Sequence, residues 1–164
     1  MTGAPKDQWL NATQGRAWLA YMQVYHRLEY EMNRNLQTES DMSLGDYTVM
    51  NALSQAAGHR MQLTSLATMI GWERSRLSHH LQRMTRRGLV DRVPSESDGR
   101  ATDALLTDAG WTTLQEAAPR HVAWVRRLFF TDITAGQEDV LADILSVVYE
   151  NILREGTLPR PGQS

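Results

Sequence analysis

Cysteine is absent from the 164 residues of the sequence. This absence excludes disulfides, thiolate metal ligands and oxidation sensing by thiols. The sequence also lacks a run of about 18 uninterrupted apolar residues, which a membrane-spanning helix needs. The first residues, MTGAPKDQWLNATQG, lack the basic region and the apolar run of a secretory signal. These absences predict a cytoplasmic protein without membrane contacts.

A large excess of charge of either sign is missing as well. The sequence has 19 acidic and 17 basic residues and a formal net charge of −2, which excludes a polycation that coats nucleic acid indiscriminately. Positive charge is nevertheless concentrated in residues 74–92, which contain six arginines and one acidic residue, Asp91. Any contact with nucleic acid is therefore expected to be local to this segment.

The motifs of common enzymes are also missing. The sequence has no Gly-rich phosphate loop, no nucleophile elbow and no histidine paired with a carboxylate in a recognisable motif. The five histidines are scattered without the helical spacing of metal ligands, and no cysteine assists them. We therefore expect neither an enzyme nor a metal or cofactor site.

The sequence does show helical periodicity at both ends. Its apolar content, 41%, is ordinary. Apolar residues recur every three or four positions in 13–36 and again in 107–155. Thr107 and Thr134 are placed to cap helices, and Pro119 should kink or restart the helix that contains it. Both segments are apolar on more sides than one subunit would bury. A long intramolecular bundle would explain this excess, but dimerisation by the two ends explains it better.

The central segment, residues 43–106, begins with a helix. Ser43 and Asp46 have the spacing of a capping box, with Asp in place of Glu. We expect this helix to run to about Ala57 and to end at Gly58.

Two further helices follow in close succession. Thr64 or Ser65 caps the first, which ends at Gly71, and the second spans residues 74–87. Two helices joined by a short turn containing Gly are typical of a helix-turn-helix. The polar face of the second helix carries Ser75, Arg76, His79, Gln82, Arg83 and Arg86. Such a face is usually only solvated, so its arginines need a further clue.

That clue is a predicted hairpin. Two short alternating runs, 89–94 and 101–106, flank turn-forming residues at 95–99. A hairpin that follows a helix-turn-helix makes a winged helix. Arg100 is placed to reach a minor groove, and Asp98 is expected to hold its guanidinium by a fork of hydrogen bonds.

At this point the sequence resembles the MarR family of bacterial transcription regulators. The resemblance lies in L-A-x-x-I-G, in R-S-x-L-S-x-x-L-x-R-M-x-x-R-G-L-V-D-R, and in D-G-R-A-x-x-x-x-L-T-x-x-G at the wing. It implies a mainly α fold with a small β wing in one chain, 1–164. The winged helix-turn-helix would occupy 43–106, between dimerisation helices at 13–36 and 107–155. It also implies a homodimer that regulates transcription, as a repressor, from a pseudo-palindromic operator in double-stranded DNA.

The resemblance also suggests roles for single residues. Ser75, Arg76 and His79 match positions that approach base edges, with Arg76 bidentate on guanine, whereas His80 and Arg83 are better placed for phosphates. For Ser65 and Ser75 a purely local cap or turn role stays open. A charged histidine here would make affinity fall as the pH rises through about 6.5. The residues expected at DNA are Thr64, Ser65, Arg74, Ser75, Arg76, His79, His80, Arg83, Asp98 and Arg100.

Members of the family often bind small aromatic or phenolic effectors between the dimerisation helices and the winged helix. The residues that could line such a pocket here are Trp18, Tyr21, Met22, Tyr25, His26 and Met50. The same residues serve equally well as core and interface packing. A second alternative concerns the whole protein, because a winged helix can also bind an acidic protein partner instead of an operator.

Overall fold

The computed structural model describes residues 9–96 and 98–162, which form six α-helices and a three-stranded sheet. The mainly α class with a small β wing is confirmed. No helix in this part of the chain is long and apolar enough to cross a membrane. In chain order the elements are α1 (Ala12–Ser40), α2 (Leu44–Ser54), the 3₁₀ turn η2 (Ala57–His59), β1 (Arg60–Gln62), α3 (Leu63–Ile70), α4 (Arg74–Arg86), β2 (Val90–Pro94), β3 (Thr102–Leu106), α5 (Asp108–Phe129) and α6 (Ala135–Glu155).

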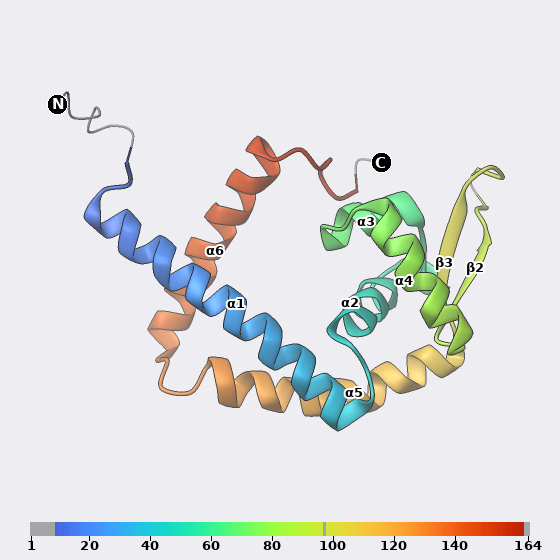
Figure 1. The fold of residues 1–164 in the computed structure, drawn as a ribbon, viewed down its shortest axis with the longest axis horizontal. Coiled ribbons are helices and arrows are strands. Elements are labelled where there is room, and N and C mark those ends of the chain that lie inside the picture. Colours follow the sequence, from blue (N-terminus) through green and yellow to red (C-terminus); the bar gives the residue numbers. More distant parts are fainter. Residues whose placement is uncertain (1–8, 97, 163–164) are drawn as a thin grey trace.

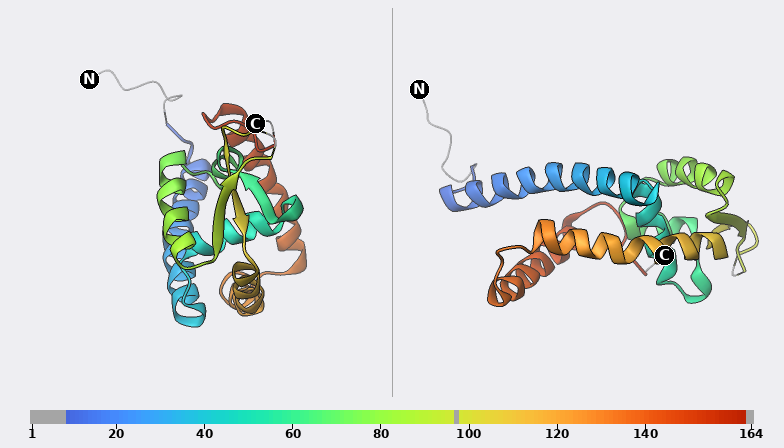
Figure 2. Two further views of the ribbon diagram at one scale, coloured as in Figure 1. Left: turned by 90° about the vertical axis from the view of Figure 1, so that its right-hand side faces the viewer. Right: turned by 90° about the horizontal axis from the view of Figure 1, so that it is seen from below.

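The long helices and the small elements occupy different parts of the molecule. From α2 to β3 the elements form one lobe, and α1 and α5 pack together and extend away from it (Figures 1 and 2). α6 lies at the far end of α5, away from the wing (Figure 1). The lobe is therefore attached to the rest of the chain through α1 and α5.

The core of the lobe lies between α2, α3, α4 and the sheet. Leu53, Leu66, Leu77, Leu81 and Val90 are fully buried there. The sheet is antiparallel in the order β1-β3-β2, with Met61 opposite Ala104 on one side and Arg92 opposite Ala104 on the other. Strand β1 was not predicted, because three residues are too few to show an alternating pattern.

Of the two N-terminal caps predicted in the lobe, the one for α2 is confirmed and the one for α3 is wrong. The Ser43–Asp46 capping box is confirmed, with each side chain bonded to the other residue's backbone amide at 3.0 Å. The predicted cap at Thr64 or Ser65 is wrong, because α3 begins at Leu63 and its N-cap position is Gln62. Burial of the Leu63 side chain directly after β1, and not a hydroxyl cap, fixes this start.

The junction between α4 and α5 depends on Thr107. Its hydroxyl caps α5 by accepting from the Gly110 amide at 2.9 Å, and it donates to the Gly88 carbonyl at 2.6 Å. Gly88 itself has a φ of +70°, which suits glycine. A Cβ at Gly110 would lie 2.0 Å from the Leu89 carbonyl oxygen. This close approach accounts for the Thr and Gly of the L-T-x-x-G motif.

Pro119 does not restart the helix, contrary to that part of the expectation. α5 continues through Pro119 as one helix of 22 residues. A proline leaves the carbonyl four residues earlier without its helical donor, here that of Gln115. Both residues are exposed, so water can bond to that carbonyl.

Asp46 is the one carboxylate buried at the centre of the junction between α2 and α4. Its oxygens accept from the Ser43 amide and from Arg87 at 2.7 Å, and one lies 2.9 Å from His80 Nε2. Burial by itself would raise the pKa of Asp46, but the nearby His80, Ser43 and Arg87 groups outweigh this effect and lower it. The pKa of Asp46 therefore lies well below its ordinary value.

Removal of this charge should weaken the lobe. We expect Asp46→Asn to lower the free energy of unfolding at pH 7 by about 2 kcal/mol. The loss is smaller than for a fully buried ion pair, because Arg87, the charged partner of Asp46, is half-exposed. Because the pKa of Asp46 is lower in the folded chain, the loss of stability in Asp46→Asn persists above pH 3.8, which is the ordinary pKa of Asp. The loss shrinks below that pH. Urea unfolding of wild type, Asp46→Asn and the exposed control Asp91→Asn measures the difference. A deficit that stays constant down to pH 2 would contradict this role of the charge.

Candidate nucleic-acid interface

The two faces of α4 are separated as the sequence predicted. Leu77, Leu81 and Met84 are fully buried against the lobe core. The residues predicted for the polar face are all exposed, namely Ser75, Arg76, His79, Gln82, Arg83 and Arg86, as is Arg74 at the start of the helix. The lobe thus presents a row of cations and hydrogen-bond donors to the outside.

His80 differs from its prediction as a phosphate contact. It is on the buried side of α4, with 9% of its surface exposed. Its Nε2 faces Asp46, and its Nδ1 lies 2.8 Å from Arg83 Nη2. The ring is therefore directed into the junction between α2 and α4 and is not available to DNA. The step from His79 to His80 turns a residue by about 100°, which separates an exposed histidine from a buried one.

Arg76 also has a partner within the lobe. Its guanidinium carbon lies 4.1 Å from the centroid of the Trp72 ring, a cation–π contact. Trp72 is half-buried in the turn between α3 and α4. The Arg76 side chain is thereby restricted while its guanidinium edge stays exposed.

Arg60 fastens the wing to the lobe. Its guanidinium donates to buried Asp103 at 2.7 Å and to the Pro94 carbonyl at 2.5 Å, and it also forms an ion pair with Glu96. These partners come from both strands and the loop of the wing. Arg60 was not predicted from the sequence, because it precedes the helix-turn-helix and its partners lie more than 30 residues away.

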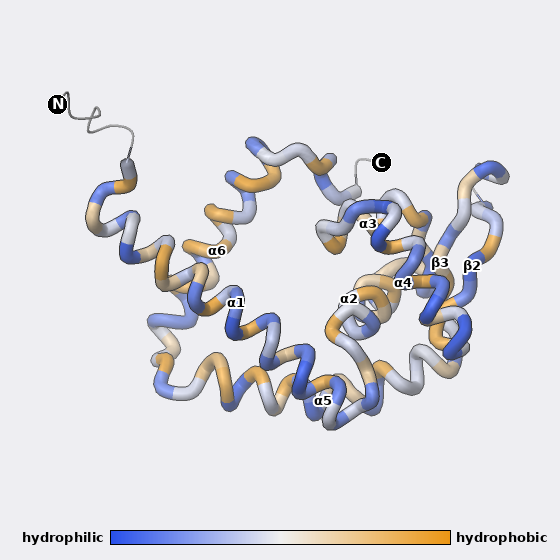
Figure 3. Tube along the Cα trace, in the orientation of Figure 1, coloured by the Kyte–Doolittle hydropathy of each residue, from blue (hydrophilic) through white to orange (hydrophobic). Residues whose placement is uncertain are grey.

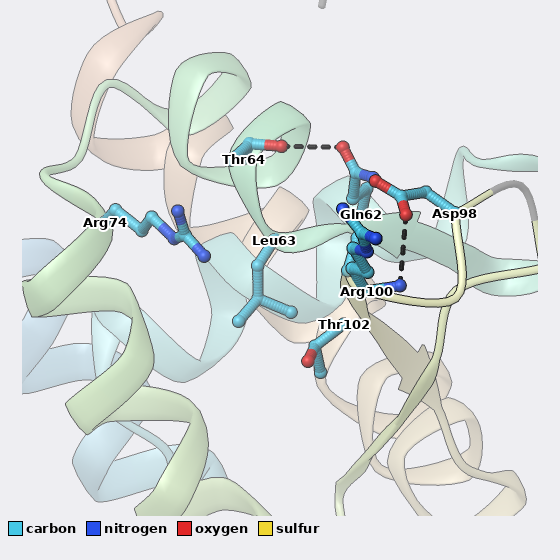
Figure 4. A pocket seen from close by; sticks show the side chains of 8 residues that line it. Gln62, Leu63, Thr64, Arg74, Asp98, Arg100 and Thr102 are labelled. Carbon is cyan, nitrogen blue, oxygen red and sulfur yellow. Dashed lines mark hydrogen bonds between the residues drawn. The ribbon is translucent and has the colours of Figure 1, made fainter.

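A cavity of about 250 Å³ separates the wing from the start of α4. Arg74 lies on one side of it and Arg100 on the other, with Thr64 of α3 at its rim (Figure 4). The predicted fork between Asp98 and the Arg100 guanidinium is wrong. Asp98 instead accepts from the Arg100 backbone amide at 3.0 Å, an Asx-type turn that shapes the loop (Figure 4). The Arg100 guanidinium therefore remains exposed beside a second arginine.

A second cavity, of about 420 Å³, lies between α1, α2 and the turn before α4. Of the six residues predicted for an effector pocket, His26 lines this cavity. Met50 is fully buried in the lobe core, and the Trp18, Tyr21 and Tyr25 rings are exposed along α1. These four residues and Met22 do not line this cavity. The observed lining is His26, Glu29, Tyr30, Asn33, Leu44, Gly45, Thr48, Trp72 and Arg76.

Exposed large apolar side chains are concentrated on the terminal helices. In the described part of the chain, all of these side chains except Met69 lie outside the lobe. α6 buries none of its residues, and Val140, Ile144 and Val147 are each more than half exposed. Hydrophobic positions recur along its length (Figure 3). These helices therefore carry apolar surface that the single chain leaves in water.

Metal chemistry finds no support in the described residues. Nowhere in 9–96 or 98–162 do three or more His, Asp or Glu side chains gather in a way that could hold an ion.

Comparison with known proteins gives one consistent result. The MarR family pattern matches residues 40–101. AbsC, a MarR family transcriptional regulator from Streptomyces coelicolor, is 35% identical over 88% of this chain and 97% of its own, with a TM-score of 0.81. Sco3205, a MarR family regulator from the same organism solved in complex with DNA, is 34% identical over 93% of this chain and 99% of its own, with a TM-score of 0.85. The HTH-type transcriptional repressor IacR of Pseudomonas putida is 28% identical over 138 residues, which are 82% of this chain and 77% of that protein.

The role of Arg60 in the wing can be tested without DNA. We expect Arg60→Met, which keeps the aliphatic stem, to speed hydrogen exchange of the Ser95 and Ala101 amides about tenfold or more, because the hairpin loses its tie to β1. Exchange in α5 should stay unchanged. Arg92→Met, on the exposed face of β2, is the matched control. Equal exchange rates in both variants would show that the hairpin is stable without the contacts of Arg60.

Proposed function

Since the chain belongs to the MarR family of transcriptional regulators, we propose that it is a homodimer that reads a pseudo-palindromic operator and represses transcription. The chain is a regulator and not an enzyme. The observation that carries the proposal is the exposed cationic face of α4, with Arg100 of the wing beside it, in a protein with a net charge of −2. Repression is suggested by IacR, which is named a repressor. We place the protein in the cytoplasm, with its DNA.

In this proposal α4 lies in the major groove. Ser75, Arg76 and His79 approach base edges, with Arg76 bidentate on guanine, and Arg83 binds a phosphate. His80 is not included, because its ring is buried.

The wing and α3 contact the flanking backbone. Arg100 enters the adjacent minor groove, and Asp98 holds the loop that presents it. Arg74 lies across the cavity from Arg100, which favours a phosphate between the two guanidinium groups. Thr64 and Ser65 are in the first turn of α3, and a helix N-terminus suits another phosphate.

The second copy of the chain covers the terminal helices. Burial of apolar surface drives association, and α1, α5 and above all α6 leave such surface exposed. A two-fold axis between the copies would place the two α4 helices about 34–36 Å apart, one turn of DNA.

A small aromatic or phenolic effector would fit the second cavity. Tyr30 and Trp72 offer apolar rings there, and Arg76 offers a cation. Such a ligand releases DNA only if it binds the chain better in the DNA-free arrangement. Packing alone also accounts for these side chains.

Operator binding depends first on two arginines. We expect Arg76→Ala and Arg100→Ala each to weaken operator binding in a gel shift about tenfold to a hundredfold, at about 1–3 kcal/mol for a lost base contact. Both variants should keep the wild-type sedimentation and circular dichroism. Arg16→Ala removes the same charge from the N-terminal part of α1 and should bind normally. A protein-interaction module without operator readout would instead bind scrambled duplex as well as the palindrome, with no loss in either variant.

Dimerisation can be tested on α6. We expect the double variant Ile144→Asp/Val147→Asp to sediment as a monomer at micromolar concentration, because a partner helix would have to bury two carboxylates. Ser146→Asp adds a charge at a polar position of the same helix and should leave the dimer intact. A wild-type chain that itself sediments as a monomer would reject the two-fold scaffold.

A further inference from the structure

We propose that His80 is a positioning residue for DNA binding: its ring, held beside Asp46, orients Arg83 directly and Arg76 through Trp72. The inference rests on the proposed function for what the two arginines do. It does not rest on that function for how His80 holds them, because the contacts belong to the free protein.

His80 is the centre of a chain of contacts from the interior to the surface. Nε2 is buried and lies 2.9 Å from Asp46 Oδ1, an electrostatic contact without a hydrogen bond. On the other side of the ring, Nδ1 lies 2.8 Å from Arg83 Nη2. The ring thus connects a buried anion to an exposed cation one helical turn along α4.

The Arg83 contact decides where the imidazole proton sits. A guanidinium has only donors, so His80 Nδ1 must accept and cannot carry a proton. The proton is therefore on Nε2, the atom that faces the Asp46 carboxylate. Nδ1 protonation would place two donors against each other and break the contact with Arg83.

The second branch of the contact chain reaches Arg76. The Trp72 and His80 rings meet edge to face, with their centroids 5.2 Å apart, and the Arg76 guanidinium lies over Trp72. Gly45 of α2 leaves room for both rings. A Cβ at Gly45 would lie 2.7 Å from His80 Cε1 and 3.1 Å from Trp72 Cη2.

The consequence is preorganisation of two arginines. A long side chain loses rotamer freedom when it binds a base or a phosphate, which lowers affinity. Arg76 and Arg83 lose part of that freedom already in the free protein, because Trp72 and His80 hold them.

The first test concerns the operator and uses the full-length dimer. His80→Phe keeps a ring against Trp72 but removes both nitrogens. We expect about tenfold weaker operator binding at pH 7.5. The slope of the logarithm of affinity against the logarithm of salt concentration should also be smaller by about 1, as for Arg83→Ala. The double variant His80→Phe/Arg83→Ala should bind no more weakly than Arg83→Ala, because both changes remove one shared contact. Thr85→Ala, at another exposed position of α4, is the control. Additive losses would overturn the proposal.

The second test needs no DNA. Nitrogen-15 NMR of the free wild-type protein should show His80 as the neutral tautomer protonated at Nε2. In Gly45→Ala the added methyl should displace the ring and alter its nitrogen shifts. A proton on Nδ1 would overturn the proposal. A wild-type chain that binds no palindrome but shows the Nε2 tautomer would reject the proposed function and leave the His80 geometry established.

Discussion

Burial of one apolar face of α4 is the constraint on which the rest of the structure depends. Leu77, Leu81 and Met84 are fully buried against α2, α3 and the sheet, and a helix has no other way to pack such a stripe. This packing fixes the rotation of α4 and therefore the direction of every arginine on its opposite face. The cationic surface is thus a consequence of the core.

The polar contacts of Asp46 also help to fix how α2 and α4 pack. One carboxylate caps α2, pairs with the end of α4 through Arg87, and faces His80 in its middle. A buried charge is costly unless it is paired, so these partners cannot exchange freely. The relative position of α2 and α4 is therefore determined at a polar contact as well as by shape.

The two parts of the chain expose opposite kinds of surface, and this division explains the whole layout. The lobe buries its apolar residues and exposes arginines, whereas α1, α5 and α6 keep apolar side chains in water. A surface of the first kind suits a polyanion, and one of the second suits a copy of the same chain. The long helices α1 and α5 connect the two parts.

Local patterns in the sequence were enough to predict most elements, since the signals that set them are local. The Ser43 capping box, the apolar stripe of α4 and the Thr107 cap each lie within a few residues of the helix they specify, and all three are confirmed. The exposed face of α4 followed from the same periodicity. Sequence likeness to one family supplied the function that these patterns alone left open.

Only the tertiary structure decided which polar side chains face inward. His80 and His79 are neighbours in the sequence, but packing of α4 on α2 buries one and exposes the other. Strand β1 and the contacts of Arg60 form because residues more than 30 positions apart pair across the wing. No local pattern in the sequence encodes such a pair. The sequence by itself therefore determined the helices, the hairpin and the cationic face. The buried Asp46 and His80 network and the orientation of the wing required the folded chain, because their energy comes from contacts between distant segments.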